Sequence, residues 1–332
     1  MIKKSEVILF ATLLCIAVVV TPSLQAQSLH EERGNHMGAS PLMNPDELRT
    51  APPDIGSANT VTEASVNNPQ QPDGKAISFT TIDYPGASYS LVLDTNASTA
   101  VGMFSFDAGN TVHAFSIKGT KYKTLAIPGS SASWAAGINT GGQIVGVSVD
   151  MSGTWHGFVE NGTSITPLDY PGALMTAADD INDSGEIVGF HADSSNQGGF
   201  LYKAGTFTNI SFPGSARTQA FAINTNGDIV GRWKDVANVY HGYVLKNGVF
   251  TSLDFPQAVY TDSWGINDAG TISGTYDDAA GLEHGYTYAN GTFTKIDVVG
   301  ASFTELYHIK NNGTIVGSFV DSLSETHGIK GH

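Results

Sequence analysis

Short segments in which apolar and polar residues alternate follow one another from about Phe79 to the C-terminus. Representative segments are Gly199 to Tyr202, Thr206 to Ser211, Thr218 to Asn224 and Asp228 to Trp233. Alternation with a period of two is typical of strands that bury one face, and no sustained helical period interrupts it. Gly, Thr, Val, Ile, Phe and Tyr are abundant in the same region, which favours strands and turns. The pattern therefore predicts an all-β protein.

Three landmarks recur along this region in the same order. The first is a turn, mostly Pro-Gly, that begins at Pro85, Pro128, Pro171, Pro213 and Pro256, with Val299-Gly300 in the sixth copy. The second is an Ile/Val-Val-Gly segment that ends at Gly102, Gly146, Gly189, Gly231, Gly274 and Gly317. The third is a His-small-aromatic segment at His113, His156, His241 and His284, with variants at Gly198 and His327. The prolines are spaced by 42 or 43 residues, so the chain is a sixfold repeat.

Each repeat contains four short strand segments, and four strands in about 43 residues is typical of a propeller blade. Asn161-Gly162, Asn247-Gly248 and Asn290-Gly291 are hairpin turn sequences, which predicts antiparallel neighbours. The repeat therefore predicts a six-bladed β-propeller of four-stranded antiparallel blades over residues 77–332. A β-solenoid is the alternative, but its coils are shorter and lack two hairpin turns and a Pro-Gly crossover.

The phase of the repeat predicts the strand order within a blade. The ordered region begins with Phe79–Asp83 and ends with the strand of His327. Closing the ring requires the N-terminal strand to pair with the C-terminal one, so Phe79–Asp83 is expected to be the outermost strand of the last blade. The segment that ends in Ile-Asn is then innermost, and it carries small residues where strands converge, such as Gly137, Ala222 and Gly265.

The N-terminal region predicts export. Lys3 and Lys4 precede an apolar run from Val7 to Val20, and a small, polar segment follows, which is typical of a secretory signal peptide over residues 1–26. The alternative is a permanent membrane anchor, but the run is shorter than the roughly 20 residues that span a bilayer. Residues 27–76 are polar and rich in Pro, Asn, Ser and Asp, which predicts a disordered linker. We expect a bacterial monomer that is secreted or periplasmic, with no membrane insertion after removal of the leader.

Composition narrows the classes of partner. The formal charge of −15 becomes −16 when Lys3, Lys4 and Glu6 leave with the leader, and such a surface repels nucleic-acid phosphates. Cys15 is the only cysteine and lies in the leader, so the mature chain has no disulfide, cysteine metal site or thiol nucleophile. We expect no cofactor. Calcium is an open alternative because of the acidic loops around Asp277, Asp278 and Glu283.

The segment His113-Ala114-Phe115, with the recurrent Ile-Asn-x-x-Gly-x-Ile-Val-Gly and Pro-Gly-Ala segments, resembles the HAF-repeat family of bacterial extracellular proteins. The likeness spans nearly all of residues 79–332, and it departs from the pattern at Gly198 and Val299. The resemblance implies export and propeller-like repeats. It implies no activity, substrate or catalytic residue.

An aspartate precedes the landmark histidine by six residues in most repeats. The pairs are Asp107 and His113, Asp150 and His156, Asp235 and His241, Asp278 and His284, and Asp321 and His327. A carboxylate beside an imidazole can activate a general base or a nucleophile. A catalytic site is needed once, however, whereas this pair recurs in nearly every blade. We therefore interpret the pair as a bond that fixes a loop, and we predict no catalytic and no metal site there.

Function in a repeated scaffold is expected where the copies differ. The predicted strand order places the Pro-Gly crossovers and the Asp-containing loops on one face. Candidate ligand-binding residues on this face are Trp134, Trp155, Arg217, Trp233, Tyr240, Tyr260, Asp262 and Glu305. Exposed aromatic groups beside polar ones bind sugar rings or protein partners, although the same aromatics can simply pack between blades. Trp264, with Phe221 and Tyr307 at equivalent positions, is expected to be buried.

Asp180 and His308 are polar exceptions at an inner-strand position that carries small residues in other repeats. They are expected near the axis, where they would line a small-molecule site or hold trapped water.

Three functions are compatible with these features. The first is an exported module that binds a carbohydrate or a protein on the loop face without catalysis. The second is a hydrolase or lyase in the central funnel, with Asp180, Arg217, Asp262, Glu305 or His308 as acid, base or electrophile. The third is a structural protein of the cell surface or matrix. No catalytic motif stands out above the repeat, which favours the binding module.

Overall fold

The computed structural model describes residues 63–65, 77–107, 111–194 and 197–332. Its regular elements are 25 β-strands, so the all-β prediction is confirmed for this part of the chain. No described segment forms an apolar helix of bilayer-spanning length. The predicted leader and nearly all of the predicted linker lie outside the described residues.

The strands form six four-stranded units, and the strands of each unit fall into four classes by position. The innermost strands are β3 (Tyr89–Thr95), β7 (Ser130–Ile138), β11 (Met175–Ile181), β15 (Arg217–Ile223), β19 (Tyr260–Ile266) and β23 (Phe303–Ile309). The second strands are β4 (Thr99–Ser105), β8 (Ile144–Asp150), β12 (Ile187–Ala192), β16 (Ile229–Lys234), β20 (Ile272–Asp277) and β24 (Ile315–Val320). The third strands are β5 (His113–Lys118), β9 (Trp155–Asn161), β13 (Gln197–Lys203), β17 (Tyr240–Lys246), β21 (Glu283–Ala289) and β25 (Thr326–Gly331). The outer strands are β6 (Lys121–Thr124), β10 (Ser164–Leu168), β14 (Thr206–Ile210), β18 (Val249–Leu253), β22 (Thr292–Ile296) and β2 (Ser78–Ile82).

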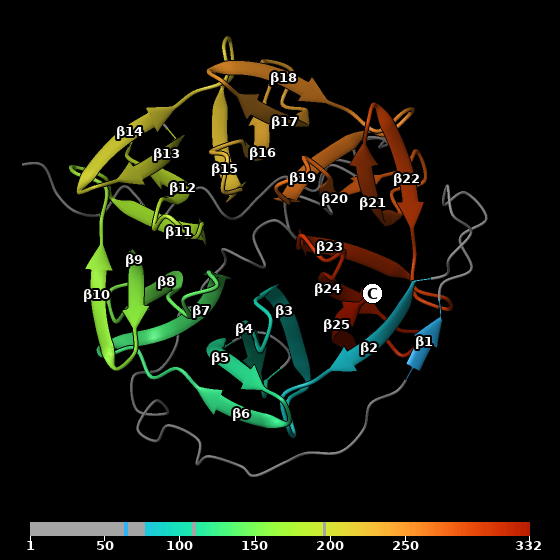
Figure 1. The fold of residues 1–332 in the computed structure, drawn as a ribbon, viewed down its shortest axis with the longest axis horizontal. Coiled ribbons are helices and arrows are strands. Elements are labelled where there is room, and N and C mark those ends of the chain that lie inside the picture. The colour runs from blue at the N-terminus through green and yellow to red at the C-terminus, as the bar shows by residue number, and fades with distance from the viewer. Residues whose placement is uncertain (1–62, 66–76, 108–110, 195–196) are drawn as a thin grey trace, which may run out of the picture.

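The units are arranged around a common axis, as in a β-propeller (Figure 1). Units 2 to 5, from β7–β10 to β19–β22, are separate antiparallel sheets. The four strands β23, β24, β25 and β2 form the sixth unit, which we call the terminal unit. The terminal unit, unit 1 (β3–β6) and strand β1 belong to one nine-stranded sheet. Each inner strand contacts the inner strand of the next unit, and β23 contacts β3. The predicted inner position of the Ile-Asn segments is confirmed.

The two ends of the described chain meet in the terminal unit. Strand β2 pairs antiparallel with β25, with Phe79 opposite Gly331 and Ile82 opposite Gly328. The predicted pairing of the N-terminal strand with the C-terminal one is therefore observed. Strand β1 (Glu63–Ser65) pairs in turn with the free edge of β2, so a short strand lies within the range predicted as linker. An unpaired outer edge offers backbone donors and acceptors, which accounts for this addition.

A bulge in each inner strand explains the Gly landmark. In β3 the pairing with β4 shifts between Val92 and Asp94. A Cβ atom on Gly102 of β4 would lie 1.9 Å from the Leu91 carbonyl oxygen, and one on Gly274 would lie 2.1 Å from that of Asp262. Only glycine allows the second strand to approach the bulge this closely.

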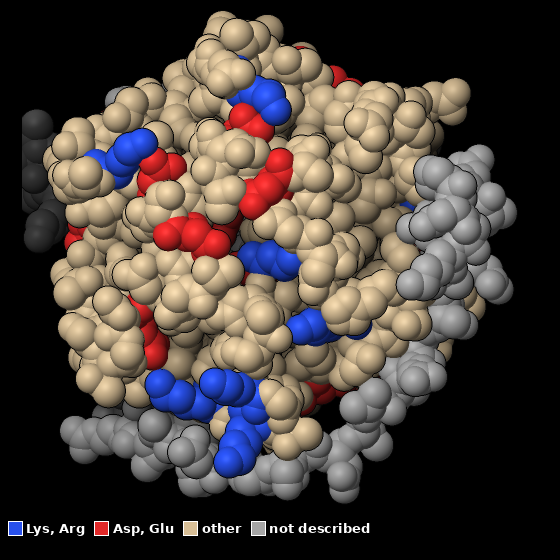
Figure 2. Space-filling view, in the orientation of Figure 1, with Lys and Arg blue, Asp and Glu red and all other residues tan. Residues whose placement is uncertain are grey.

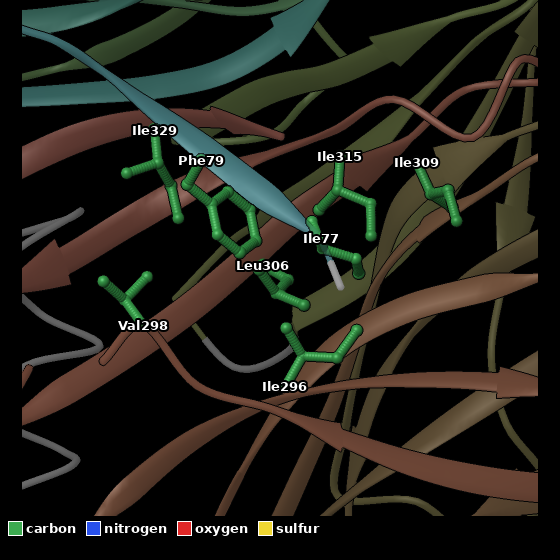
Figure 3. Packing of buried hydrophobic residues seen from close by; sticks show 8 residues of the cluster. All are labelled: Ile77, Phe79, Ile296, Val298, Leu306, Ile309, Ile315 and Ile329. Carbon is green, nitrogen blue, oxygen red and sulfur yellow. The ribbon is translucent and has the colours of Figure 1, made fainter. Parts of the chain in front are cut away.

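Apolar side chains fill the wedges between neighbouring units. Figure 3 shows the wedge between unit 5 and the terminal unit, where Phe79 of β2 lies beside Ile329 and Leu306. Phe79 and Ile329 are fully buried, and Ile296 of β22 completes the contact with unit 5. Burial of these side chains ties the N-terminal strand to the rest of the molecule.

Asparagine side chains join the inner ends of the units into a ladder, which we call the amide ladder. In each hydrogen bond of the ladder, an asparagine Nδ2 donates to the carbonyl oxygen of the equivalent residue in the next unit. The bonds are Asn96 to Asn139 (3.0 Å), Asn139 to Asn182 (3.3 Å), Asn182 to Asn224 (3.1 Å), Asn224 to Asn267 (3.1 Å) and Asn267 to Lys310 (3.4 Å). In the terminal unit Lys310 replaces asparagine, and its Nζ lies 2.6 Å from Asp94 Oδ1 of unit 1. Every unit is thus joined to the next through a polar side chain.

The landmark histidines bridge the two loops that flank them. In unit 4, His241 Nδ1 lies 2.8 Å from Asp254 Oδ1, and its Nε2 lies 3.6 Å from Asp235 Oδ2. The equivalent bridges are Asp150–His156–Asp169, Asp278–His284–Asp297 and Asp321–His327–Asp83. The interpretation that the Asp-His pair fixes a loop is confirmed in these four units. The partner that sequence analysis missed is the aspartate just after the outer strand.

On the face seen in Figure 2, uncharged surface separates several small groups of charged side chains, and blue groups lie together at the lower edge of the view. Blue and red groups lie next to each other at several places in this view. Two ion pairs of this kind join neighbouring strands, Lys203–Glu186 and Lys246–Asp228, the second with an oxygen–nitrogen distance of 3.0 Å. Such partly exposed pairs contribute little to the free energy of unfolding.

Replacing Phe79 by alanine tests the attachment of the N-terminal strand. The change removes a fully buried ring from β2 and should lower the free energy of unfolding by about 3–5 kcal/mol. Chemical denaturation monitored by circular dichroism measures it. Thr80→Ala, a half-buried position of the same strand, is the control and should change stability little. Equal effects of the two changes would contradict the packing of β2.

The amide ladder predicts a cost for Asn182→Ala. The change leaves the carbonyl of Asn224 without its side-chain donor and removes the Oδ1 that accepts from the Ser184 and Glu186 backbone N–H groups. We expect a loss of about 1–3 kcal/mol in denaturant unfolding. Ser184→Ala, an exposed position in the same turn, should be close to neutral.

The bridging histidines predict an opposite pH dependence for two variants. The hydrogen bond to Asp254 raises the pKa of His241, so its contribution to stability is full below about pH 6.5 and is lost as the pH rises through the folded-state pKa. Burial lowers the pKa of His113, where Ala126 occupies the place of the aspartate. His241→Gln should therefore lower the melting temperature more at about pH 6 than at about pH 9. His113→Gln should lower it less at about pH 6 than at about pH 9. The same trend in both variants would refute this assignment.

Candidate functional site

Two cavities lie along the axis around which the units are arranged. The turn-side cavity, of about 370 Å³, is lined by the turns that follow the inner strands, including Asn139, Asn224 and Lys310. The crossover-side cavity, of about 90 Å³, is lined by residues nearer the start of the inner strands. His308 lines both, so the two cavities lie on opposite sides of its side chain.

Aromatic rings form most of the wall of the crossover-side cavity. They are Trp134, Trp155, Phe190, Phe221, Trp264 and Tyr307. Trp134 and Trp155 meet edge to face, with ring centroids 4.9 Å apart. Trp264 stacks on Phe221 at 4.1 Å. These contacts hold the rings in fixed orientations, so the wall is formed before any ligand binds.

The position of this cavity follows from the residue at the bulge of each inner strand. These residues are Leu93, Ala136, Asp179, Phe221, Trp264 and Tyr307. In four units this residue has a large side chain that occupies the space around the axis. In units 2 and 3 it is Ala136 or Asp179, which are smaller. The space that these two leave is bounded by Trp134 and Trp155 of unit 2 and Phe190 of unit 3. The cavity is therefore a consequence of broken symmetry in the repeat.

Asp179, Gln219 and Arg232 form the polar edge of the cavity. Arg232 donates through Nε to Gln219 and through Nη1 to the Tyr260 hydroxyl. Its Nη1 also lies 3.2 Å from Asp262 Oδ2. These bonds fix the orientation of the guanidinium group and offset its charge.

A cation–π contact adds to this support, because the guanidinium of Arg232 lies 4.5 Å from the ring centroid of Tyr240. The arginine is thus positioned from three sides by residues of units 4 and 5.

Asp179 is the titratable group of the cavity. Burial raises the pKa of its carboxyl well above the usual value, the charge of Asp180 raises this pKa further, and Arg232 opposes both. Its Oδ2 atom is buried and has no hydrogen-bond partner among the described residues. Oδ2 of Asp179 can therefore accept a hydrogen bond from a hydroxyl group, and a carboxyl group that is protonated can also donate one.

On the turn side, the structure brings the predicted pair Asp180 and His308 together. His308 Nε2 lies 3.4 Å from Asp180 Oδ2, and the same oxygen accepts the backbone N–H of Ile223 at 2.9 Å. Burial raises the pKa of Asp180, but His308, Lys310 and this N–H outweigh burial and hold the pKa below its usual value. Asp180 is therefore an anion that joins unit 3 to unit 4 and to the terminal unit.

The crossovers and the Asp-containing loops begin at the same edge of each sheet, as predicted. In unit 5, for example, the Val259 N–H in the crossover donates to the carbonyl of Asp277, where the loop begins. The predicted candidates nevertheless separate into groups. Trp134, Trp155 and His308 line the crossover-side cavity. Tyr240, Tyr260 and Asp262 support Arg232, while Glu305 bonds the hydroxyl group of Tyr307.

Like Tyr240, Tyr260, Asp262 and Glu305, the last two candidates lie outside the cavity linings. Arg217 is exposed at the start of β15. Trp233 stacks on Phe212 at 4.2 Å and donates from Nε1 to Ser252. The equivalent stacks of Tyr84 on Phe104 and Phe255 on Tyr276 occur in other units, so Trp233 occupies a repeated packing position.

Sequence analysis missed part of the cavity lining. It did not single out Asp179, Phe190 or Gln219, and it expected Trp264 to be merely buried. Trp264 is in fact partly exposed in the cavity wall. The signal that could have found Asp179 is its place at the bulge, where the other repeats carry apolar residues.

Comparison with known proteins adds the fold. No protein-family model and no curated protein sequence matches the chain. Among solved structures, AofleA from Arthrobotrys oligospora is 13% identical over 87% of this chain and 92% of its own, with a TM-score of 0.51. The Aleuria aurantia lectin, described as a six-bladed β-propeller with fucose recognition, is 12% identical over 75% and 93%, with a TM-score of 0.46. Virginiamycin B lyase from Staphylococcus aureus is 13% identical over 78% and 85%, with a TM-score of 0.46. The likeness to AofleA extends to the fold alone, so function has to be argued from the chain's own residues.

Proposed function

We propose that this protein is a binding module that takes one sugar residue into the crossover-side cavity and does not convert it. The observation that carries this proposal is the division of the cavity wall. One side is aromatic, with Trp134 and Trp155, and the other is polar, with Asp179, Gln219 and Arg232. A sugar ring has the matching division, since its C–H face packs on aromatic rings and its hydroxyl groups need donors and acceptors.

The polar edge offers both kinds of hydrogen-bonding group. Asp179 presents a carboxyl group whose Oδ2 has no partner among the described residues, and Gln219 and Arg232 lie on the same side. Arg232 is already bonded to Tyr260 and Asp262, so it can donate to a ligand without moving. The cavity, at about 90 Å³, is smaller than typical ligand sites of roughly 300–1,000 Å³, so it can take part of one terminal residue but not an internal segment of a chain.

We also infer that the terminal unit is the sixth blade of a closed ring. The pairing of β2 with β25, the contact between β23 and β3, and the Lys310–Asp94 ion pair support closure. A closed ring keeps the cavity walls, which come from all six units, in fixed relative positions. We further propose that the protein acts after export, on the basis of Lys3, Lys4 and the apolar run that follows.

Sugar binding is tested with the full chain in a calorimetric titration against single monosaccharides: neutral hexoses, a deoxyhexose and a uronic acid. One of them should bind, and Trp155→Ala and Asp179→Asn should each weaken its binding about tenfold, the equivalent of one lost buried contact. Trp233→Ala is the matched control, because this tryptophan lies outside the cavity lining, and it should leave the affinity unchanged.

Several outcomes would overturn this proposal. They are the absence of binding by every sugar, or an affinity that depends on Trp233 and not on Trp155. Turnover of a glycoside that carries the bound sugar, assayed separately, would instead support the hydrolase or lyase alternative.

A further inference from the structure

One position of the inner strand carries three polar groups in a ring that is otherwise made of small residues. The equivalent residues are Asp94, Gly137, Asp180, Ala222, Gly265 and His308. The small neighbours make the room for the polar ones. A Cβ atom on Gly137 would lie 2.8 Å from Asp180 Cα, and one on Gly265 would lie 2.6 Å from His308 Cα. The site of Asp94, Asp180 and His308 is thus built into the innermost layer of the ring.

The three side chains meet although they come from units 1, 3 and the terminal unit. One ligand atom from each lies within 4.8 Å of the other two. His308 Nε2 lies 3.4 Å from Asp180 Oδ2, and His308 Nδ1 lies 3.8 Å from Asp94 Oδ1. Atoms that share one ion at bond lengths of about 2.1 Å lie up to about 4.2 Å apart, and the distance from Nε2 to Asp180 is within this range. The distance to Asp94 is measured from the other ring nitrogen, so binding through Nε2 requires the imidazole or Asp94 to move.

Backbone groups orient all three side chains. Asp94 Oδ2 accepts the N–H of Ile138 at 2.8 Å, and Asp180 Oδ1 accepts that of Ile181 at 2.8 Å. His308 Nδ1 lies 3.2 Å from the carbonyl oxygen of Ile309. A proton on Nδ1 satisfies this carbonyl and leaves Nε2 free as a ligand, the arrangement that commonly supports a metal-bound histidine.

We propose that Asp94, Asp180 and His308 bind one divalent transition-metal ion through two carboxylate oxygens and Nε2. The mixed oxygen and imidazole donors suit Zn²⁺ or Mn²⁺ better than Ca²⁺. The turn-side cavity, lined by Asp180 and His308, gives the ion a way in.

In the metal-free protein, the ammonium group of Lys310 pairs with Asp94 in place of the metal ion. Its Nζ lies 2.6 Å from Asp94 Oδ1, and its side chain is 25% exposed at the cavity. The ion displaces this ammonium group, which remains protonated and moves into the cavity. Lys310 therefore competes with the metal for Asp94.

Calorimetric titration of the chelator-treated full chain with Zn²⁺, Mn²⁺ and Ca²⁺ tests this site. Zn²⁺ or Mn²⁺ should bind with a stoichiometry of about one and Ca²⁺ more weakly. His308→Ala should weaken binding at least about tenfold, since even the loss of a residue that merely supports a ligand has such an effect. Lys310→Met should strengthen binding because it removes the competitor.

The matched control is His327→Ala, which alters the other group of metal-ligating side chains, Asp321, Glu325 and His327, outside the axis. It should leave the affinity unchanged. Loss of binding in His327→Ala but not in His308→Ala would overturn the proposal, as would the absence of binding in the wild-type chain. Should His308→Ala melt at a much lower temperature, Lys310→Met decides, because an unchanged affinity in this variant would also overturn the proposal.

Discussion

Neighbouring inner strands of this protein run side by side without pairing as a sheet, so the units need another source of directional bonds. The amide ladder supplies it, with one asparagine in each of units 1 to 5. The same asparagine caps its own turn, as Asn182 does through Oδ1. One residue thus fixes both the local turn and the spacing of the units, which explains why Ile-Asn recurs in the repeat. Apolar wedges then fill the space that the ladder defines.

Most of this architecture could be predicted, because each landmark has a local physical cause. The recurring glycine of the second strand is required where that strand meets the bulge, and the pairing of Phe79–Asp83 with the last strand follows from counting strands. Only one of the two aspartates in each histidine bridge was predicted. The other follows an outer strand, 13 residues from the histidine for Asp254 and 244 residues from it for Asp83. Contacts between strands are set by register rather than by distance along the chain.

The candidate site was harder to predict for a related reason. Whether a side chain faces the axis depends on the bulge, which shifts the alternation by one residue. Asp179 and Asp180 illustrate this, since adjacent carboxyl groups line opposite cavities and have pKa values shifted in opposite directions. Arg232 is a second-strand residue that reaches the axis only because Gln219, Tyr260 and Asp262 hold it there. The residues of the candidate site are those that differ from the equivalent residues in the other repeats. Their environment therefore cannot be inferred from another copy of the repeat.

The terminal unit also determines the order in which this protein can fold. Strand β2 is among the first described segments to be synthesised, yet its partner β25 is the last. Units 1 to 5 each consist of consecutive strands, whereas the pairing of β2 with β25 can form only after β25 has been synthesised. Pairings between distant segments slow folding and expose apolar strands in the meantime. The short strand β1 pairs with the free edge of β2 and so covers an edge that could otherwise pair with another strand.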